Sequence, residues 1–142
     1  MTGKVEIVRQ WYQDVWIDRK WDRMDELYRP ANEEDCLSSG ASTSASETRE
    51  MVISFANLVT DQRIRIIHSI EKGEWVSALV EMYGFNAVTD EPIYMRWTSM
   101  VRIQDGRIVE TYPSINFLSF FEQLGQLPKD SFELLLGGTI LK

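Results

Sequence analysis

The sequence predicts one α+β domain in which helices cover a curved antiparallel sheet and enclose an apolar pocket. Apolar residues recur at helical spacing up to about residue 59, and from Asp61 onward they alternate with polar residues. Helices followed by a block of strands indicate an α+β layer arrangement and not a parallel α/β sheet. Because 142 residues is a common size for one domain, we expect a single domain over 1–142, with a core at about 4–128 and a C-terminal extension at 129–142.

Three amphipathic helices are expected ahead of the sheet. The first covers residues 4–16, because one apolar stripe recurs there, at Val5, Val8, Tyr12, Val15 and Trp16. A second helix is expected after an Asp18 cap, and it ends near Pro30, since proline disfavours helical geometry in the residue before it. A polar loop over residues 31–45 precedes a third helix, whose apolar positions are Met51, Val52, Phe55, Leu58 and Val59.

Four strands are expected next, over residues 64–70, 76–82, 93–103 and 107–112, where the alternation is clearest. Lys72-Gly73 and Asp105-Gly106 supply turns, and an Asp-Gly pair between alternating segments is a strong hairpin signal. Asn116 is placed to cap a short helix that Gly125 ends. A further short helix is expected after Pro128. Long strands with helices on one side can curl around them and leave a hollow.

Charge and motif content exclude several classes of partner. The formal net charge is -7, and no run of positive residues exceeds Arg19-Lys20. Nucleic acid and anionic membrane surfaces are therefore not expected as partners, because both require a basic patch. The sequence has no P-loop, no dinucleotide-binding glycine pattern and no metal-spaced cluster of His, Asp or Glu. We accordingly expect neither a cofactor nor a metal.

Cysteine content and hydropathy indicate the compartment. Cys36 is the only cysteine, so an intrachain disulfide is excluded. Residues 1–10 alternate charged and apolar side chains and lack the apolar core of a signal peptide. No stretch approaches the roughly 20 apolar residues that span a bilayer. These features predict a cytoplasmic protein.

Three segments taken together resemble a known family. They are residues 8–16 (VRQWYQDVW), 102–110 (RIQDGRIVE) and 120–128 (FFEQLGQLP). Their order and spacing resemble those of SnoaL-like polyketide cyclases, within the nuclear transport factor 2-like superfamily. The resemblance implies a cone-shaped, cystatin-like α+β barrel with a helix-capped pocket, commonly a homodimer through the outer sheet face. Members of the superfamily include cyclases, isomerases, hydrolases, dehydratases and non-catalytic binding domains, so the fold alone does not select an activity.

The sequence departs from the cyclase pattern in its last strand. Many cyclase-like members continue there to a Trp and then to aspartates, one of which serves as a general acid or base. Residue-by-residue matching places Tyr112 at the Trp, and Pro113 and Asn116 at the aspartates. Neither side chain exchanges a proton in a useful pH range. Whether the chain is an enzyme therefore stays open.

Two residues are the candidates for catalysis. His68 is the only histidine, and the alternation places it on the same face as Ile64, Ile66 and Ile70, so we expect it to point into the pocket. Asn116 offers a donor and an acceptor to a carbonyl oxygen. The alternatives are a hydrogen-bonded structural role for His68 and a helix cap for Asn116.

The expected pocket wall is aromatic. Trp97 and Ser99 alternate with Arg96 and Thr98, which gives the pocket one stacking wall and one hydroxyl. Glu81 is expected on the opposite, outer face of its strand; a buried Glu81 would instead have a raised pKa and act as a proton shuttle. The residues expected to bind a substrate are Trp16, Tyr28, Phe55, Met82, Trp97, Ser99, Tyr112, Phe117 and Phe120.

Three functions are compatible with these residues. The first is a cofactor-independent cyclase, isomerase or hydrolase acting on an oxygenated apolar small molecule, with His68, Tyr112 or Asn116 polarising a carbonyl. The second is a non-catalytic domain of the same fold that binds a small apolar or aromatic ligand or serves as a dimeric scaffold. The third is an interaction domain whose apolar tail, residues 132–141, docks onto a partner or a second copy.

Overall fold

The structure is a computed structural model that describes residues 3–30 and 45–142. Most of the predicted polar loop, and with it Cys36, lies outside the described residues. No described helix is long and apolar enough to cross a membrane. The elements in chain order are α1 (Lys4–Gln10), the π-helical segment η1 (Trp11–Ile17), α2 (Arg23–Leu27), α3 (Ala45–Leu58), β1 (Val59–Lys72), β2 (Trp75–Asn86), β3 (Pro92–Gln104), β4 (Arg107–Ser114), α4 (Phe117–Gln123) and α5 (Ser131–Leu136).

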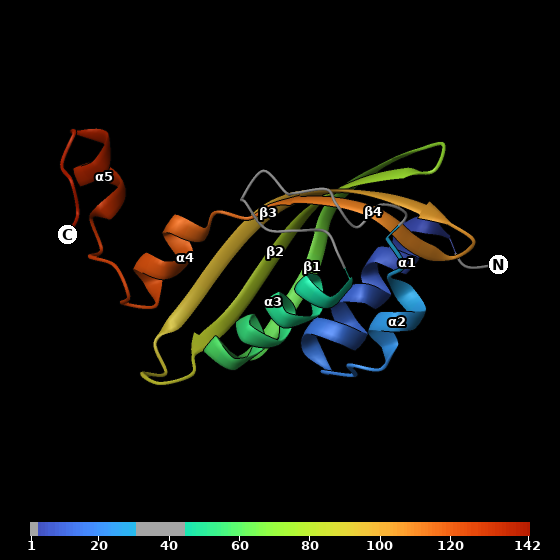
Figure 1. Cartoon of the computed structure of the whole chain (residues 1–142), viewed down its shortest axis with the longest axis horizontal. Helices are drawn as coiled ribbons and strands as arrows, with labels where there is room; N and C mark the ends of the chain where they lie inside the picture. Colours follow the sequence, from blue (N-terminus) through green and yellow to red (C-terminus); the bar gives the residue numbers. More distant parts are fainter. Residues whose placement is uncertain (1–2, 31–44) are drawn as a thin grey trace.

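The four strands form one antiparallel sheet in the order β1-β2-β3-β4. Figure 1 shows that the sheet is curved and that α1, α2 and α3 lie against one of its faces. Two-residue turns at Gly73 and Gly106 connect β1 to β2 and β3 to β4, and both glycines have positive φ, of 58° and 74°. These are the turns that the sequence predicts. The predicted α+β class with a curved antiparallel sheet is confirmed.

The first predicted helix is divided into two geometries. α1 is α-helical, whereas η1 makes wider turns, so that the Asp18 amide donates to the Gln13 carbonyl five residues earlier, at 2.9 Å. The apolar stripe is buried as expected. In η1 the buried side chains are those of Trp11, Tyr12, Val15 and Trp16. Asp18 ends η1 and does not cap the next helix, so that detail of the prediction is wrong.

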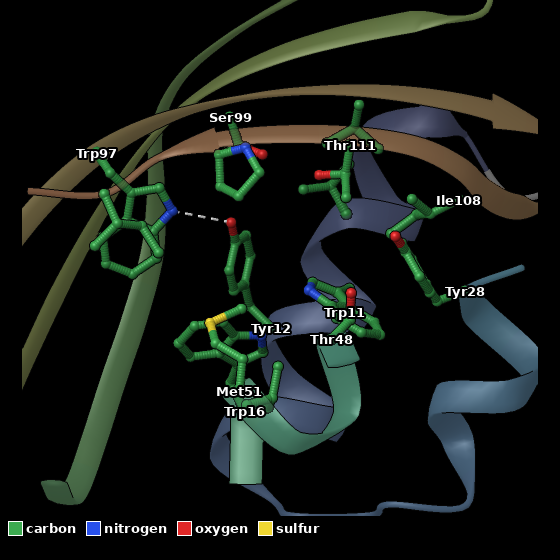
Figure 2. A pocket seen from close by; sticks show the side chains of 15 residues that line it. Trp11, Tyr12, Trp16, Tyr28, Thr48, Met51, Trp97, Ser99, Ile108 and Thr111 are labelled. Atoms are coloured by element: carbon green, nitrogen blue, oxygen red, sulfur yellow. Dashed lines mark hydrogen bonds between the residues drawn. The ribbon is translucent and has the colours of Figure 1, made fainter. Parts of the chain in front are cut away.

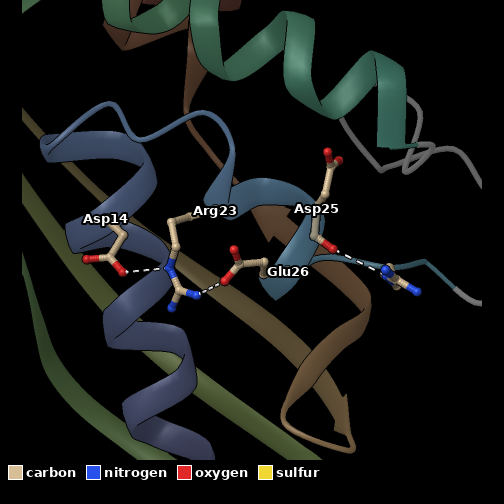
Figure 3. A network of polar contacts seen from close by, with 5 residues as sticks. Asp14, Arg23, Asp25 and Glu26 are labelled. Atoms are coloured by element: carbon tan, nitrogen blue, oxygen red, sulfur yellow. Dashed lines mark hydrogen bonds and ion pairs between the residues drawn. The ribbon is translucent and has the colours of Figure 1, made fainter.

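A side-chain network connects η1 to α2. The Arg23 guanidinium donates to the Asp14 carboxylate at 3.1 Å and also pairs with Glu26 one turn further along α2 (Figure 3). After α2 the chain runs beside β4, where the Arg29 amide donates to the Ile108 carbonyl at 2.8 Å. Tyr28 thereby forms a parallel β-bridge with Ile108 at the β4 edge of the sheet.

β1 begins directly after α3, without a connecting loop. The change from helical to alternating spacing comes at Val59, two residues before Asp61, which itself has a φ of 50°. Gly84 on β2 lies against this junction. A Cβ added to Gly84 would lie 2.5 Å from Cγ1 of Val59 and 3.2 Å from the Thr60 carbonyl, so the close approach of β2 to the start of β1 requires glycine here.

The core fills the space between the inner sheet face and the helices. Its aromatic centre is continuous: the Trp16 ring lies 5.0 Å from Phe55, and Phe55 stacks on Phe120 at 4.5 Å between ring centroids. Val80 and Met82 of β2 are fully buried beneath these rings. The C-terminal α4 thus packs on the same core as α3.

The outer sheet face carries exposed apolar and aromatic side chains around one ion pair. Glu81 lies on this face, as predicted, but its side chain is covered, and Arg65 donates to its carboxylate at 2.8 Å. Hydrogen bonds from Tyr83 and from Arg65 lower the pKa of Glu81, so it stays ionised and does not have the raised pKa of a proton shuttle. The exposed residues here include Ile70, Tyr83, Tyr94 and Met100.

The C-terminal extension departs from the body of the molecule. In Figure 1, α5 stands apart from the sheet and from α1–α3. Phe132 and Leu136 are exposed, at 53% and 76% of their surface, and so is Ile140 beyond the helix. The predicted short helix after Pro128 is present as α5, and its apolar side chains are largely exposed.

Candidate functional site

A small apolar cavity lies between η1, α3 and the inner faces of β3 and β4 (Figure 2). Its volume is about 40 Å³, which is room for about three water molecules. The wall is mostly aliphatic and aromatic, with hydroxyl groups distributed around it. The lining residues are Val8, Trp11, Tyr12, Trp16, Tyr28, Thr48, Met51, Val52, Trp97, Ser99, Val101, Ile108, Thr111, Pro113 and Ile115.

The polar centre of the cavity is the phenol of Tyr12. The Trp97 indole Nε1 donates to the Tyr12 oxygen at 3.1 Å, and the two rings meet edge to face at 5.9 Å (Figure 2). Burial raises the pKa of Tyr12 to about 12, although hydrogen bonds with Trp97 and Ser99 oppose the rise. Tyr12 is therefore a neutral phenol at physiological pH, able to donate its proton in a hydrogen bond but not to act as a base.

β3 supplies one wall of the cavity, in the orientation that the alternation predicts. β2 and β3 pair without a register shift from Trp75–Arg102 to Phe85–Pro92. Trp97, Ser99 and Val101 consequently all face inward and are buried. The prediction of their inward direction is confirmed.

His68 lies outside the cavity, contrary to the prediction. Ile66 pairs with the buried Val80, but His68 pairs with Leu79, which leaves Ile67 as an extra residue between the two pairs. This β-bulge shifts the alternation by one, so His68 is exposed on the outer face. A proton-transfer role for His68 in the cavity is thereby excluded in this structure.

A second β-bulge moves Tyr112 to the outer face. β3 and β4 change register between Arg102 and Ile103, which leaves Val109 as the extra residue. The Tyr112 ring stacks on Trp75 at 6.3 Å, on the side of the sheet away from the cavity. Tyr112 therefore does not line the cavity, contrary to the prediction that it contacts a ligand there.

The same bulge places two other β4 residues in the cavity wall. Thr111 lies opposite Val101 and Pro113 opposite Ser99, both on the inner face. Pro113 thus occupies a wall position, as its match to a cyclase aspartate implied, but it carries no ionisable group. Thr111 contributes a hydroxyl that simple alternation assigns to the wrong face.

Asn116 is a helix cap, which is the alternative raised for it. Its side-chain oxygen accepts a hydrogen bond from the Ser119 amide at 3.1 Å, at the start of α4. The side chain is exposed and is not part of the cavity wall. The expectation that Asn116 contacts a bound carbonyl is not met.

Of the nine residues expected to bind a substrate, Tyr112 lies on the outer face, and the other eight divide into two groups. Trp16, Tyr28, Trp97 and Ser99 line the cavity, and their role in binding remains a prediction. Phe55, Met82 and Phe120 are packed in the core beside it, and Phe117 is partly buried against that core. Four other wall residues, Trp11, Tyr12, Thr48 and Met51, were not expected in the site, although Tyr12 and Met51 belong to the predicted apolar stripes.

The described part of the cavity wall has no strong acid or base. Apart from the phenols of Tyr12 and Tyr28, none of its residues titrates, and it includes no carboxylate, imidazole or amine. Within residues 3–30 and 45–142, no three His, Cys, Asp or Glu side chains are arranged to hold a metal ion. The wall therefore offers hydrogen-bond donors in an apolar environment.

The comparisons with known proteins agree with this architecture. The family model for SnoaL-like polyketide cyclases matches residues 6–124. A search of curated proteins gives no match. Similar solved structures include a candidate polyketide cyclase from Acidithiobacillus ferrooxidans, with a TM-score of 0.71, 18% identity and coverage of 89% of this chain and 97% of that chain.

Two proteins from Streptomyces are similar to the same extent. IdmH of Streptomyces antibioticus, a candidate polyketide cyclase, has a TM-score of 0.71 and 17% identity over 87% of this chain and 99% of its own. AclR of Streptomyces galilaeus, a candidate hydroxylase, has a TM-score of 0.72 and 14% identity over 88% of this chain and 97% of its own. Likeness at this identity shows the shared fold, which hosts more than one chemistry.

Proposed function

Because the chain belongs to the SnoaL-like polyketide cyclase family, we propose that it binds an apolar, oxygenated small molecule in the cavity and polarises a carbonyl group of that molecule through Tyr12. The observation that carries the proposal is the buried hydrogen bond from Trp97 to the Tyr12 oxygen, at 3.1 Å. This bond orients a phenol that stays protonated. The surrounding wall is apolar and suits a hydrocarbon frame.

The chemistry follows from which atom donates. Since the Tyr12 oxygen accepts the indole hydrogen of Trp97, the hydrogen of its own hydroxyl group is left to be donated to a ligand oxygen. Such a donor, fixed in a dry site, stabilises negative charge that develops on a carbonyl oxygen. Enolisation or ring closure of a carbonyl compound develops charge of that kind.

Stoichiometric binding without turnover is the second candidate, and the composition of the wall favours it. The described lining residues include no group that removes a proton from carbon at neutral pH. Polarisation by Tyr12 then accelerates a reaction only where water or a group of the substrate accepts the proton. The two candidates share the binding mode and differ in turnover.

The size of the cavity requires a side chain to move when a ligand binds. At about 40 Å³ the space is smaller than one aromatic ring with its substituents. Met51 of α3 is partly buried, and its unbranched side chain rearranges at low cost. We propose that Met51 moves to admit the ligand.

Binding of acetophenone and of ethylbenzene, measured by calorimetry, tests the proposal, because the two differ in one carbonyl group. We expect Tyr12→Phe to weaken acetophenone binding about 2- to 10-fold and to leave ethylbenzene binding almost unchanged, as the loss of one hydrogen bond requires. Tyr83→Phe on the outer face is the matched control. The carbonyl stretch of bound acetophenone is expected at lower frequency in the unmodified protein than in Tyr12→Phe.

Equal effects of Tyr12→Phe on the binding of both compounds would refute the assignment of Tyr12. A separate assay distinguishes catalysis from binding alone: turnover is measured by mass spectrometry with a linear 1,3,5-triketone in tenfold excess over protein. Cyclised product in molar excess over protein supports catalysis, and recovery of unchanged triketone supports binding alone.

A further inference from the structure

The indole N–H of Trp16 is a buried donor without an acceptor. The residue is 4% exposed, its ring forms part of the cavity wall, and Nε1 has no hydrogen-bond partner among the described residues. A buried donor left unpaired is destabilising, because it has given up its hydrogen bond to water without a replacement. The only other buried side-chain atoms in this condition, within the part of the chain that the structure describes, belong to Gln62, which does not line the cavity.

The surroundings of Trp16 explain why its N–H finds no acceptor. The neighbouring rings are those of Phe55 at 5.0 Å, Tyr12 at 5.8 Å and Trp97 at 6.0 Å. Phe55 has no polar atom, and Trp97 has only a donor, which is already used by Tyr12. Within the described residues the Trp16 N–H has no acceptor, so an acceptor atom of a ligand would satisfy it.

Trp16 and Tyr12 lie four residues apart in η1, and their rings are neighbours in the wall (Figure 2). One small molecule can therefore reach both donors. We propose that Trp16 is the second hydrogen-bond anchor of the ligand, and that the cavity selects molecules with two acceptor oxygens on one apolar frame, such as diketones and keto esters. One oxygen binds at Tyr12 and the other at the Trp16 N–H. This inference rests on the proposed function of the cavity.

The unpaired donor favours ligands with two oxygens over ligands with one. A ligand with one oxygen at Tyr12 leaves the Trp16 N–H unpaired, whereas a ligand with two oxygens satisfies both donors. Sites built to hydrogen-bond a substrate group discriminate strongly against analogues that lack it. Phenylalanine at this position would give the wall an apolar ring without an unpaired donor.

The test compares 1-phenyl-1,3-butanedione, which has two oxygens, with acetophenone, which has one. We expect the unmodified protein to bind the diketone about 5- to 10-fold more tightly, from one added hydrogen bond. Trp16→Phe is expected to abolish this preference while retaining acetophenone binding. Trp75→Phe, an indole-to-phenyl change on the outer face, is the matched control and keeps the preference. A preference that persists in Trp16→Phe overturns the inference.

A second measurement uses the unmodified protein, in case Trp16→Phe does not fold. The side-chain N–H resonance of Trp16 in a ¹H–¹⁵N spectrum is expected to move downfield on addition of the diketone and much less on addition of acetophenone. Equal movement with both compounds overturns the inference. Its failure is separable from failure of the proposed function, because the latter appears as insensitivity of acetophenone binding to Tyr12→Phe.

Discussion

Replacing Tyr12 with phenylalanine changes how stability depends on pH as well as how the cavity binds. The substitution removes the phenol oxygen that accepts the hydrogen bond of the Trp97 indole N–H at 3.1 Å. Because Trp97 is 3% exposed, water does not readily replace that acceptor. We expect Tyr12→Phe to lower the free energy of unfolding by about 1–3 kcal/mol at neutral pH.

The pH dependence has a definite sign. Burial raises the pKa of Tyr12 from 10.0 to about 12, so the native state keeps this proton over a range in which the unfolded chain loses it. The contribution of the neutral phenol to stability is therefore complete well below pH 10, begins to fall near that pH, and is lost as the pH rises toward 12. The loss relative to neutral pH is about 0.4 kcal/mol at pH 10 and about 1.4 kcal/mol at pH 11.

Urea unfolding of both proteins at pH 8, 9, 10 and 11 measures this effect. All other groups that titrate in this range are common to the two proteins, so the difference between their unfolding free energies isolates Tyr12. We expect that difference to shrink above pH 9, by about 1.4 kcal/mol at pH 11. A difference that stays constant from pH 8 to pH 11 would show that the phenol ionises normally and that the cavity is wet.

Three further substitutions test other parts of the structure. Asn116→Ala removes the cap of α4 and is expected to lower the free energy of unfolding by about 1 kcal/mol, measured by thermal unfolding. Acetophenone binding is expected to stay unchanged, and weakened binding would show that Asn116 contributes to the site. Gly84→Ala places a Cβ 2.5 Å from Val59 and is expected to lower the free energy of unfolding by about 1–3 kcal/mol. An unchanged urea midpoint would contradict the close contact of β2 with the start of β1. We propose that the exposed outer sheet face forms a homodimer; Met100→Glu is then expected to halve the molar mass in light scattering, whereas deletion of residues 129–142 leaves it unchanged apart from the missing tail.

Predictions based on periodicity held where the backbone is regular. The sequence indicates the helices, the two-residue turns and the inward face of β3, because β3 pairs with β2 without interruption. His68 and Tyr112 were assigned to the wrong face for one common reason: each follows a β-bulge, at Ile67 and at Val109. A bulge depends on pairing between strands, and the local pattern of apolar residues does not record it.

The periodicity also does not predict whether an inward side chain lines the cavity or fills the core beside it. Phe55, Met82 and Phe120 face the interior as predicted, but they fill it, because aromatic and thioether side chains pack closely where α3 and α4 meet the sheet. Tyr12 was recognised only as a member of an apolar stripe. Its role as the polar centre depends on Trp97, which is 85 residues away in the chain.

The bulge at Val109 affects how this chain is aligned with its relatives. A relative with a regular last strand needs one residue fewer to reach the same depth, so an ungapped alignment pairs its inward side chains with outward ones here from Glu110 onward. Placing a single-residue gap at Val109 restores the correspondence, and the inward positions of this part of the strand are then Thr111 and Pro113. Side chains of homologues that lack the extra residue are therefore to be compared with Thr111 and Pro113 by strand pairing and not by residue count.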